Sequence, residues 1–139
     1  MAEPGRTGRA GRADSSGRSD RSARLLARLL ATSGTAHFVV PGPFDAIVPK
    51  ILPGNARTWT YASGAVELAL AAGIALPRTR RAGALLAAGF FAGVFPANVK
   101  MARDWRDRAA PLRKAACARL PLQVPLVLWA LKVSRDADG

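Results

Sequence analysis

The side chains able to do chemistry are few in this chain of 139 residues, and they stand far apart in the sequence. His37 is the single histidine and Cys117 the single cysteine, so an internal disulfide and a zinc site built from Cys and His are both excluded. The chain has nine acidic residues, several of them near its ends, which disfavours a hydrolase with two buried carboxylates. Any polar site must therefore be assembled from isolated residues.

Four polar residues with an ionisable or amide side chain lie inside four largely apolar stretches, one in each: His37, Glu67, Asn98 and Gln123. In helices that alternate in direction across a membrane, all four fall in the same half. At 1.5 Å per residue, Glu67 lies about 10 Å from that end and His37 about 5 Å. We predict a shared polar cluster, either a proton or small-molecule site or a set of hydrogen bonds between helices.

The apolar stretches that must position these residues are separated by short clusters of charge. They cover residues 25–40, 60–76, 82–99 and 120–133. A bilayer core of about 30 Å requires roughly 20 helical residues, so the middle two stretches suffice alone and the outer two are short. The third stretch also lacks the polar stripe that a soluble helix keeps every three to four residues. We predict an all-α integral membrane bundle of four transmembrane helices, rather than a soluble four-helix bundle.

Composition divides the chain into three parts. Residues 1–21 place arginines among Gly and Ser, and such a segment cannot bury enough apolar area to offset its ordering entropy. We expect a disordered basic tail that attracts anionic lipids, each arginine near the membrane contributing about 1 kcal/mol. Nucleic-acid binding is disfavoured, because no aromatic residue is interleaved for base stacking. The transmembrane domain is expected over residues 22–133 and a disordered C-terminal tail over 134–139.

The distribution of basic residues indicates the orientation in the cell membrane. With both termini in the cytoplasm, the cytoplasmic segments hold eleven Lys and Arg and the outer loops hold nine, with Arg28 set aside. This small excess favours cytoplasmic N- and C-termini. Residues 44–53 are apolar but flanked by prolines and too short to span, so we expect them to lie at the bilayer surface.

Small residues suggest how the expected helices pack. Gly89 and Gly93 form a GxxxG pattern in the third apolar stretch. Such a pattern lets two helix backbones approach closely. We expect it to pack against another helix of the same chain, with homodimerisation as the alternative.

Several short motifs, in order along the chain, resemble the DoxX family of small bacterial membrane proteins. They are H-F-x-x-P at 37–41, I-V-P-x-x-L-P at 47–53, Y-x-S-G-x-x-E-L at 61–68, P-R-T-R-R at 77–81, V-F-P-A-N at 94–98 and R-L-P-L-Q at 119–123. The resemblance covers about residues 30–131 and implies a bundle of four transmembrane helices. It also implies an accessory role in membrane complexes, including quinone-coupled oxidation of sulfur compounds and defence against oxidative stress. It transfers no catalytic residues.

Two functions remain open. The chain carries no redox motif and no nucleophile constellation, which favours a non-enzymatic accessory or assembly subunit that binds a protein partner in a membrane complex. The alternative is a quinone-interacting oxidoreductase subunit, in which His37 and Glu67 relay protons near the quinone head group. No residue pattern in the chain indicates a bound cofactor. A quinone is the candidate cofactor under this alternative. Cys117 could react with an external thiol but is expected to pack as a small apolar residue.

Overall fold

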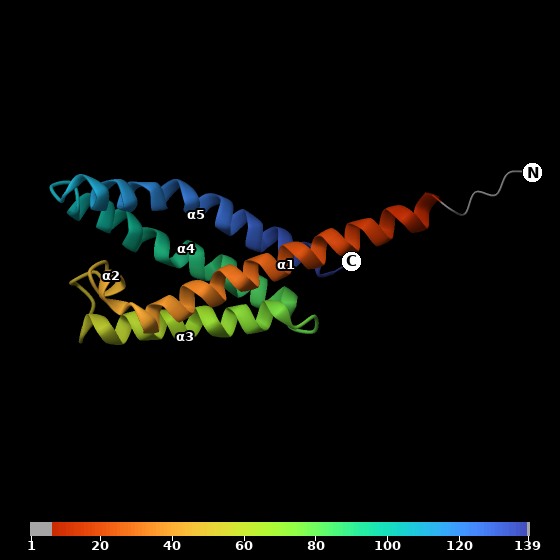
Figure 1. Cartoon of the computed structure of the whole chain (residues 1–139), viewed down its shortest axis with the longest axis horizontal. Helices are drawn as coiled ribbons and strands as arrows, with labels where there is room; N and C mark the ends of the chain where they lie inside the picture. Colours follow the sequence, from red (N-terminus) through yellow and green to blue (C-terminus); the bar gives the residue numbers. More distant parts are fainter. Residues whose placement is uncertain (1–6, 139) are drawn as a thin grey trace, which may run out of the picture.

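A computed structural model describes residues 7–138, with side chains from residue 15 onward, and this range is helical with no strand. The predicted all-α fold is confirmed. Figure 1 shows its helices, which are α1 (Thr7–Val39), α2 (Pro41–Asp45), α3 (Ala56–Ala75), α4 (Arg80–Asp104) and α5 (Ala110–Asp136).

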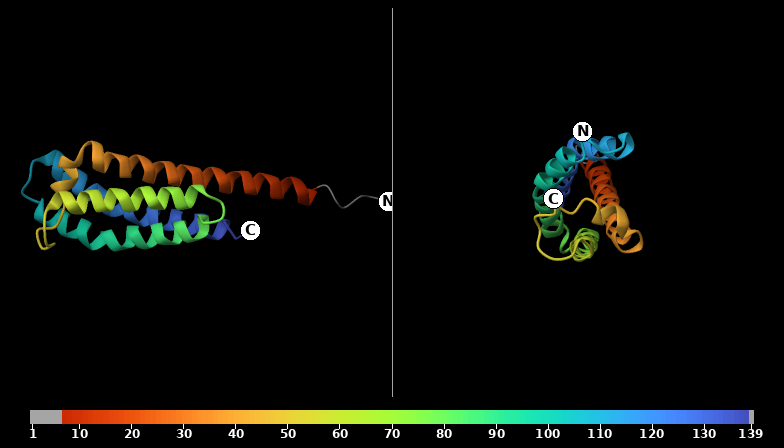
Figure 2. Two further views of the ribbon diagram at one scale, coloured as in Figure 1. Left: turned by 90° about the horizontal axis from the view of Figure 1, so that it is seen from below. Right: turned by 90° about the vertical axis from the view of Figure 1, so that its left-hand side faces the viewer.

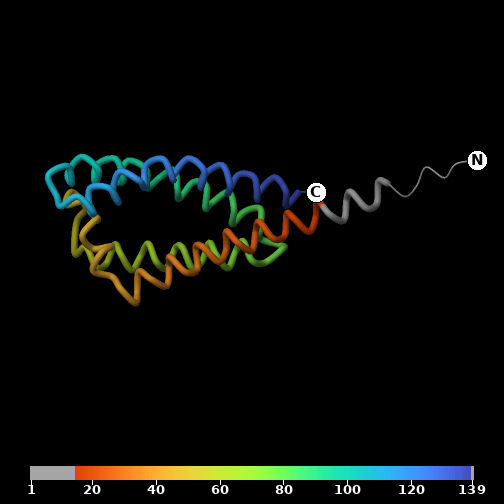
Figure 3. The backbone as a smooth tube through the Cα atoms, turned by 45° about the horizontal axis from the view of Figure 1, so that its top comes forward, coloured from red at the N-terminus to blue at the C-terminus, as the bar shows by residue number. Residues whose placement is uncertain are grey.

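The four long helices form two pairs. Helix α1 packs along α3, and α4 packs along α5, while the short turn between α3 and α4 joins the pairs. Figure 3 shows that the pairs lie close together near the C-terminus and separate toward the end that carries α2. Helix α1 is the longest and extends beyond the bundle at its N-terminal end (Figure 2). The main hydrophobic core occupies the close end, where Leu26, Leu30, Ile74 and Val133 are fully buried.

The close end depends on contacts between glycine backbones. A Cβ built on Gly83 would lie 2.8 Å from the carbonyl carbon of Gly73 and 2.9 Å from the nitrogen of Ile74. Gly34 and Gly64 bring α1 and α3 together in the same way, since a Cβ on Gly34 would lie 2.9 Å from the Gly64 carbonyl oxygen. Small residues therefore allow the helices to approach closely.

The GxxxG pattern does not take part in this packing. A Cβ built on Gly89 or Gly93 meets no atom within 4 Å in the described part of the chain. The expectation that this pair packs within the chain is therefore wrong. Both glycines are exposed on α4, because the helix turns its alanine face, with Ala84, Ala87 and Ala88, toward the core.

The N-terminal segment differs from the disorder expected for residues 1–21. Residues 1–6 lie outside the described range, but α1 is helical from Thr7. The end of this segment, near residue 20, contacts the rest of the bundle. Asp20 pairs with Arg80 at 2.5 Å, and the Trp129 indole donates a hydrogen bond to the Ser22 hydroxyl at 2.8 Å. These contacts across the chain, which composition does not reveal, favour helix over coil near residue 20.

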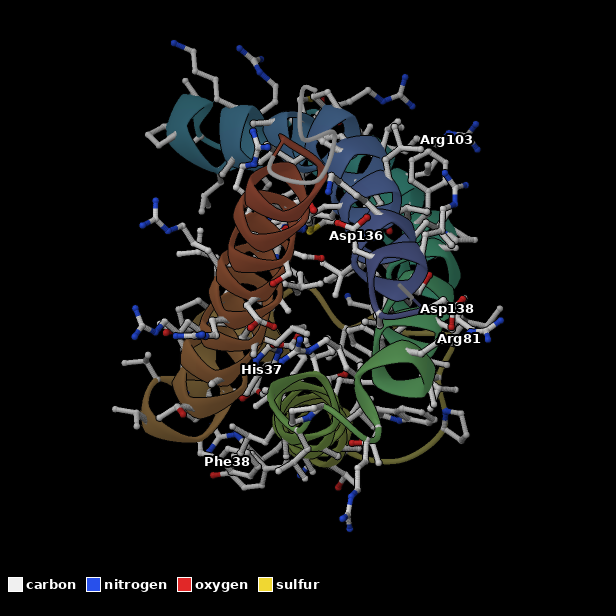
Figure 4. The ribbon with its side chains drawn as sticks, turned by 90° about the vertical axis from the view of Figure 1, so that its right-hand side faces the viewer. His37, Phe38, Arg81, Arg103, Asp136 and Asp138 are labelled. Atoms are coloured by element: carbon white, nitrogen blue, oxygen red, sulfur yellow. The ribbon has the colours of Figure 1, made fainter. Side chains whose placement is uncertain are left out.

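The C-terminal segment also differs from the disorder expected for residues 134–139. Helix α5 continues to Asp136, and Ser134 is only 4% exposed. Beyond it, Asp138 pairs with Arg81 at 3.0 Å, and Figure 4 shows this pair where α5 ends beside the start of α4. Residue 139 lies outside the described range.

Within the described residues, α4 and α5 are long and apolar enough to cross a membrane. Helix α5 qualifies because it begins at Ala110, ten residues before the apolar stretch expected to span. Neither α1 nor α3 is among these candidate spans, so the crossings expected for residues 25–40 and 60–76 stay predictions. The absence of α3 is the less expected of the two, because its stretch is long enough to span alone. Its first half is interrupted by polar residues, including Thr58, Thr60 and Ser63.

Candidate functional site

A cavity of about 820 Å³ lies between the two helix pairs, and residues of all five helices line it. Its walls are largely apolar, with Leu30, Phe90, Phe91, Leu122 and Leu126 among them. The segment after α2 closes one side through Val48, Pro49, Ile51 and Leu52. The four polar residues singled out in the sequence all line this cavity: His37, Glu67, Asn98 and Gln123.

His37 of α1 and Glu67 of α3 face each other across the contact between their helices. The His37 Nε2 atom lies 3.9 Å from the Glu67 Oε1 atom, and the two side chains are 9% and 10% exposed. Figure 4 shows His37 on the inner side of α1, whereas Phe38 lies on the outer side, where its ring stacks on Tyr61. The separation suits an ion pair or a bridging group better than a direct hydrogen bond.

The tautomer of His37 follows from its second contact. Its Nδ1 atom lies 2.8 Å from the carbonyl oxygen of Ser33, one helical turn earlier. A carbonyl oxygen can only accept, so Nδ1 carries a proton and Nε2 faces Glu67. The ring is also stacked on Phe44 at 3.8 Å between centroids, which holds its orientation. When the imidazole is neutral, Nε2 presents a lone pair on the side of Glu67.

Glu67 has an oxygen atom without a partner. The Oε2 atom is fully buried and makes no hydrogen bond within the described part of the chain, while the Ser33 hydroxyl, the His37 ring and the Arg119 guanidinium all act on this carboxyl group. Burying a carboxylate oxygen without a hydrogen bond costs on the order of 1–3 kcal/mol, and more when it is charged. A buried acid with an open acceptor beside a cavity is a feature of ligand sites, because a bound donor would satisfy it.

Asn98 and Gln123 form the second half of the polar cluster. The Asn98 amide nitrogen donates to the Gln123 Oε1 atom at 2.9 Å, and the Gln123 amide nitrogen donates to the Phe91 carbonyl oxygen. Gln123 is buried, and both of its amide atoms are used in these bonds. This pair therefore joins α5 to α4 by hydrogen bonds between helices, which was the structural alternative to a ligand site.

The sequence interpretation missed Arg119 and Phe44, which both line the cavity. Arg119 was counted with the loop charges, yet it stands one helical turn before Gln123 and lies on α5. That four-residue spacing could have placed it on the same face. Phe44 has no such signal, because Pro41 ends α1 and the chain then reverses direction.

A small polar network fixes the turn that leads into α3. The Thr60 hydroxyl donates to the Asp45 Oδ1 atom at 2.7 Å, and the Arg57 guanidinium donates to Oδ2 at 2.8 Å. Hydrogen bonding by Thr60, and then by Arg57, lowers the pKa of Asp45 below its ordinary value. The network links α2 to α3 and so holds Phe44 close to His37.

Lowering the pH is expected to destabilise this connection. The folded-state pKa of Asp45 is lowered, so its contribution is present above the unfolded pKa and is lost as pH falls through the folded value. The free energy of unfolding should therefore fall between about pH 5 and pH 2 more steeply in the natural protein than in Asp45→Asn. Chemical unfolding across that range, with Asp104→Asn as the control, measures the difference. Equal pH dependence in the natural protein and Asp45→Asn would contradict the network's role.

The chain matches the family described as Domain of unknown function (DUF8561) over residues 26–134. That match covers most of the chain, so the protein belongs to this family. No curated protein and no solved structure matches it. The resemblance to the DoxX family therefore stays a prediction. Among the described residues, no three or more His, Cys, Asp or Glu residues are placed to hold a metal ion together.

Proposed function

We propose that this chain is a DoxX-like multi-pass membrane protein of the cell membrane and that its central cavity binds a quinol. All four long helices span the bilayer, with both termini in the cytoplasm. The exposed arginines of α1, Arg21 and Arg24 among them, contact anionic lipids on that side. In a membrane complex, the chain serves as the subunit that holds the quinol.

Two features beyond the apolar α4 and α5 support four spans. Helix α3 has 20 residues, about 30 Å at 1.5 Å per residue, which matches a bilayer core. Large apolar side chains also cover the outside of every long helix, a distribution that suits lipid better than water. They include Leu25 and Phe38 of α1, Val66 and Leu68 of α3, Leu85 and Leu86 of α4, and Val124 and Leu128 of α5.

The unpartnered Oε2 atom of Glu67 is the observation that carries the ligand proposal. A quinol presents hydroxyl donors on an apolar ring, and here a carboxylate oxygen needs a donor beside a largely apolar cavity. When its ring is neutral, the His37 Nε2 atom offers a second acceptor 3.9 Å from Glu67. The cavity volume of about 820 Å³ is within the range usual for small-molecule sites.

The residues present fit a quinol, and their work is binding and proton handling. The bound group would supply two-electron redox chemistry in exchange with a partner protein. Glu67 and His37 would accept hydrogen bonds from its hydroxyl group and are the bases nearest to its protons. The apolar wall formed by Phe90, Phe91 and Leu126 would exclude water from the ring.

Binding of a soluble quinol to the purified protein tests the proposal. A decyl-substituted benzoquinol should bind to the protein in neutral detergent and raise its thermal midpoint. Its dimethyl ether keeps the ring and tail but cannot donate a hydrogen bond, so it should bind more weakly. Equal binding of the two compounds would show that the cavity does not recognise the donor, and the quinol proposal would fail.

Membrane integration is tested separately. Washing membranes with alkaline carbonate should leave the protein in the pellet, because its apolar helices are held by lipid. Reporter domains fused before Met1 and after Gly139 should both report the cytoplasm. Release by carbonate, or reporters on opposite sides, would contradict four spans.

The accessory or assembly role without a ligand is the second candidate, and the free face of α4 favours it. Gly89 has open space beside its Cα atom, and Leu85 and Leu86 are exposed on the same helix, whereas the open space beside Gly93 belongs to the central cavity. A transmembrane helix of a partner protein could approach such a face closely. This candidate explains the exposed Gly89 but leaves the open acceptor on Glu67 without a purpose.

A further inference from the structure

A second, smaller cavity lies at the end of the bundle that carries α2. Its volume is about 360 Å³, and its walls come from α2, the end of α4, the loop that follows, and the first half of α5. Figure 1 shows these segments together at the end opposite the N-terminus. Apolar side chains form most of the lining, with Ile47, Met101, Trp105 and Leu112 among them.

The charge of this cavity is positive. Arg108 and Arg119 line it, and no acidic residue is among its described lining residues. No carboxylate in the described part of the chain lies within ion-pair distance of either guanidinium. Nearby Asp104 is already paired with Lys100 at 2.5 Å. Two guanidinium groups beside an apolar wall suit an anion that carries hydrocarbon.

The smaller cavity lies where the surface of a bilayer would meet the bundle. Trp105 ends α4, one of the two helices apolar enough to span, and tryptophan is enriched at the level of lipid head groups. Arginine binds phosphate oxygens with paired N–H donors, more tightly than it binds neutral acceptors. Arg119 also lines the central cavity, so the two cavities meet at this residue.

We propose that this cavity binds the phosphate group of an anionic phospholipid. Arg108 and Arg119 donate hydrogen bonds to the phosphate oxygens, and Trp105 and Leu112 contact the start of the acyl chains. The site lies at the opposite end of the bundle from the arginines of α1. The proposal rests on the membrane location proposed above. Arg119 is shared with the central cavity, whereas Arg108 lines the smaller cavity alone, so Arg108 separates this site from quinol binding.

Lipid binding to the full-length protein in neutral detergent tests the proposal. The probes are dioctanoyl phosphatidylglycerol, dioctanoyl phosphatidylcholine and inorganic phosphate, and binding is measured by native mass spectrometry and thermal midpoint. Phosphatidylglycerol should bind most tightly. Arg108→Gln and Arg119→Gln should each weaken it roughly tenfold, because each removes a charged donor. Both arginines are exposed, so both variants should fold, and the Arg108 variant leaves the lining of the central cavity unchanged.

The matched control is Arg113→Gln. Arg113 is exposed on α5 and does not line the cavity. Its substitution removes the same charge as Arg108→Gln, but lipid binding should change little. Equal loss in Arg113→Gln and Arg108→Gln would show a general surface attraction and overturn the site. Phosphatidylcholine carries the same phosphate but no net charge, because its choline group is a cation. Equal binding of phosphatidylcholine would therefore show that the site does not select an anionic lipid. Equal binding of inorganic phosphate would show a free-anion site instead. Failure here with quinol binding intact would overturn this inference alone.

Discussion

Replacing Glu67 with Ala is expected to weaken quinol binding by about 10- to 100-fold, the usual loss for a hydrogen bond to a charged group. The substitution removes the buried Oε2 atom that has no other partner in the described chain. Glu67→Gln should lose less, because its amide oxygen remains an acceptor. Titration of the quinol into each purified variant measures the difference.

Ser63→Ala is the control for this experiment. Ser63 lines the same cavity and lies one helical turn from Glu67, so its substitution changes the lining without removing the acid. Binding should stay close to that of the natural protein. A similar loss in Ser63→Ala and Glu67→Ala would show that binding depends on the general shape of the cavity rather than on the carboxylate.

His37→Ala combined with Glu67→Ala separates a ligand site from a purely structural pair. Because the two side chains lie 3.9 Å apart, their effects on the free energy of unfolding should be non-additive by about 0.5–3 kcal/mol. Simple additivity would mean that the residues do not interact. If the two substitutions are non-additive in the free energy of unfolding but leave quinol binding unchanged, His37 and Glu67 serve only to join α1 to α3.

Gly83→Ala is expected to lower the free energy of unfolding by about 1–3 kcal/mol, the usual cost of adding a methyl group to a closely packed site. The new Cβ would lie 2.8 Å and 2.9 Å from backbone atoms of Gly73 and Ile74. Backbone atoms cannot rotate away as a flexible side chain can, so the turn between α3 and α4 must shift. Unfolding in mixed micelles of neutral and ionic detergent measures the loss.

Gly89→Ala is the matched control on the same helix. Its Cβ would meet no described atom within 4 Å, and alanine favours a helix over glycine by up to about 1 kcal/mol. The control should therefore be as stable as the natural protein, or slightly more stable. Equal loss in Gly83→Ala and Gly89→Ala would show that the close approach at Gly83 is not what limits the packing.

The sequence by itself determined the helical character and the choice of polar residues. Long apolar stretches separated by Pro and charge clusters predict helices, and the observed helices contain these stretches to within one residue. One polar residue per stretch, counted from the stretch ends, was enough to predict that His37 and Glu67 lie at similar levels. This works because helical rise per residue is constant, so position along a helix follows from counting.

Only the tertiary structure decided which residues meet. The two glycines of the GxxxG pattern have no neighbour within 4 Å, whereas Gly73 and Gly83 bring α3 and α4 together. Likewise, Phe44 stacks on His37, and Arg119 joins two cavities. These contacts depend on how each helix is rotated about its axis and on which helices become neighbours. Both are set by packing across the whole bundle, which the spacing of residues within one helix does not contain.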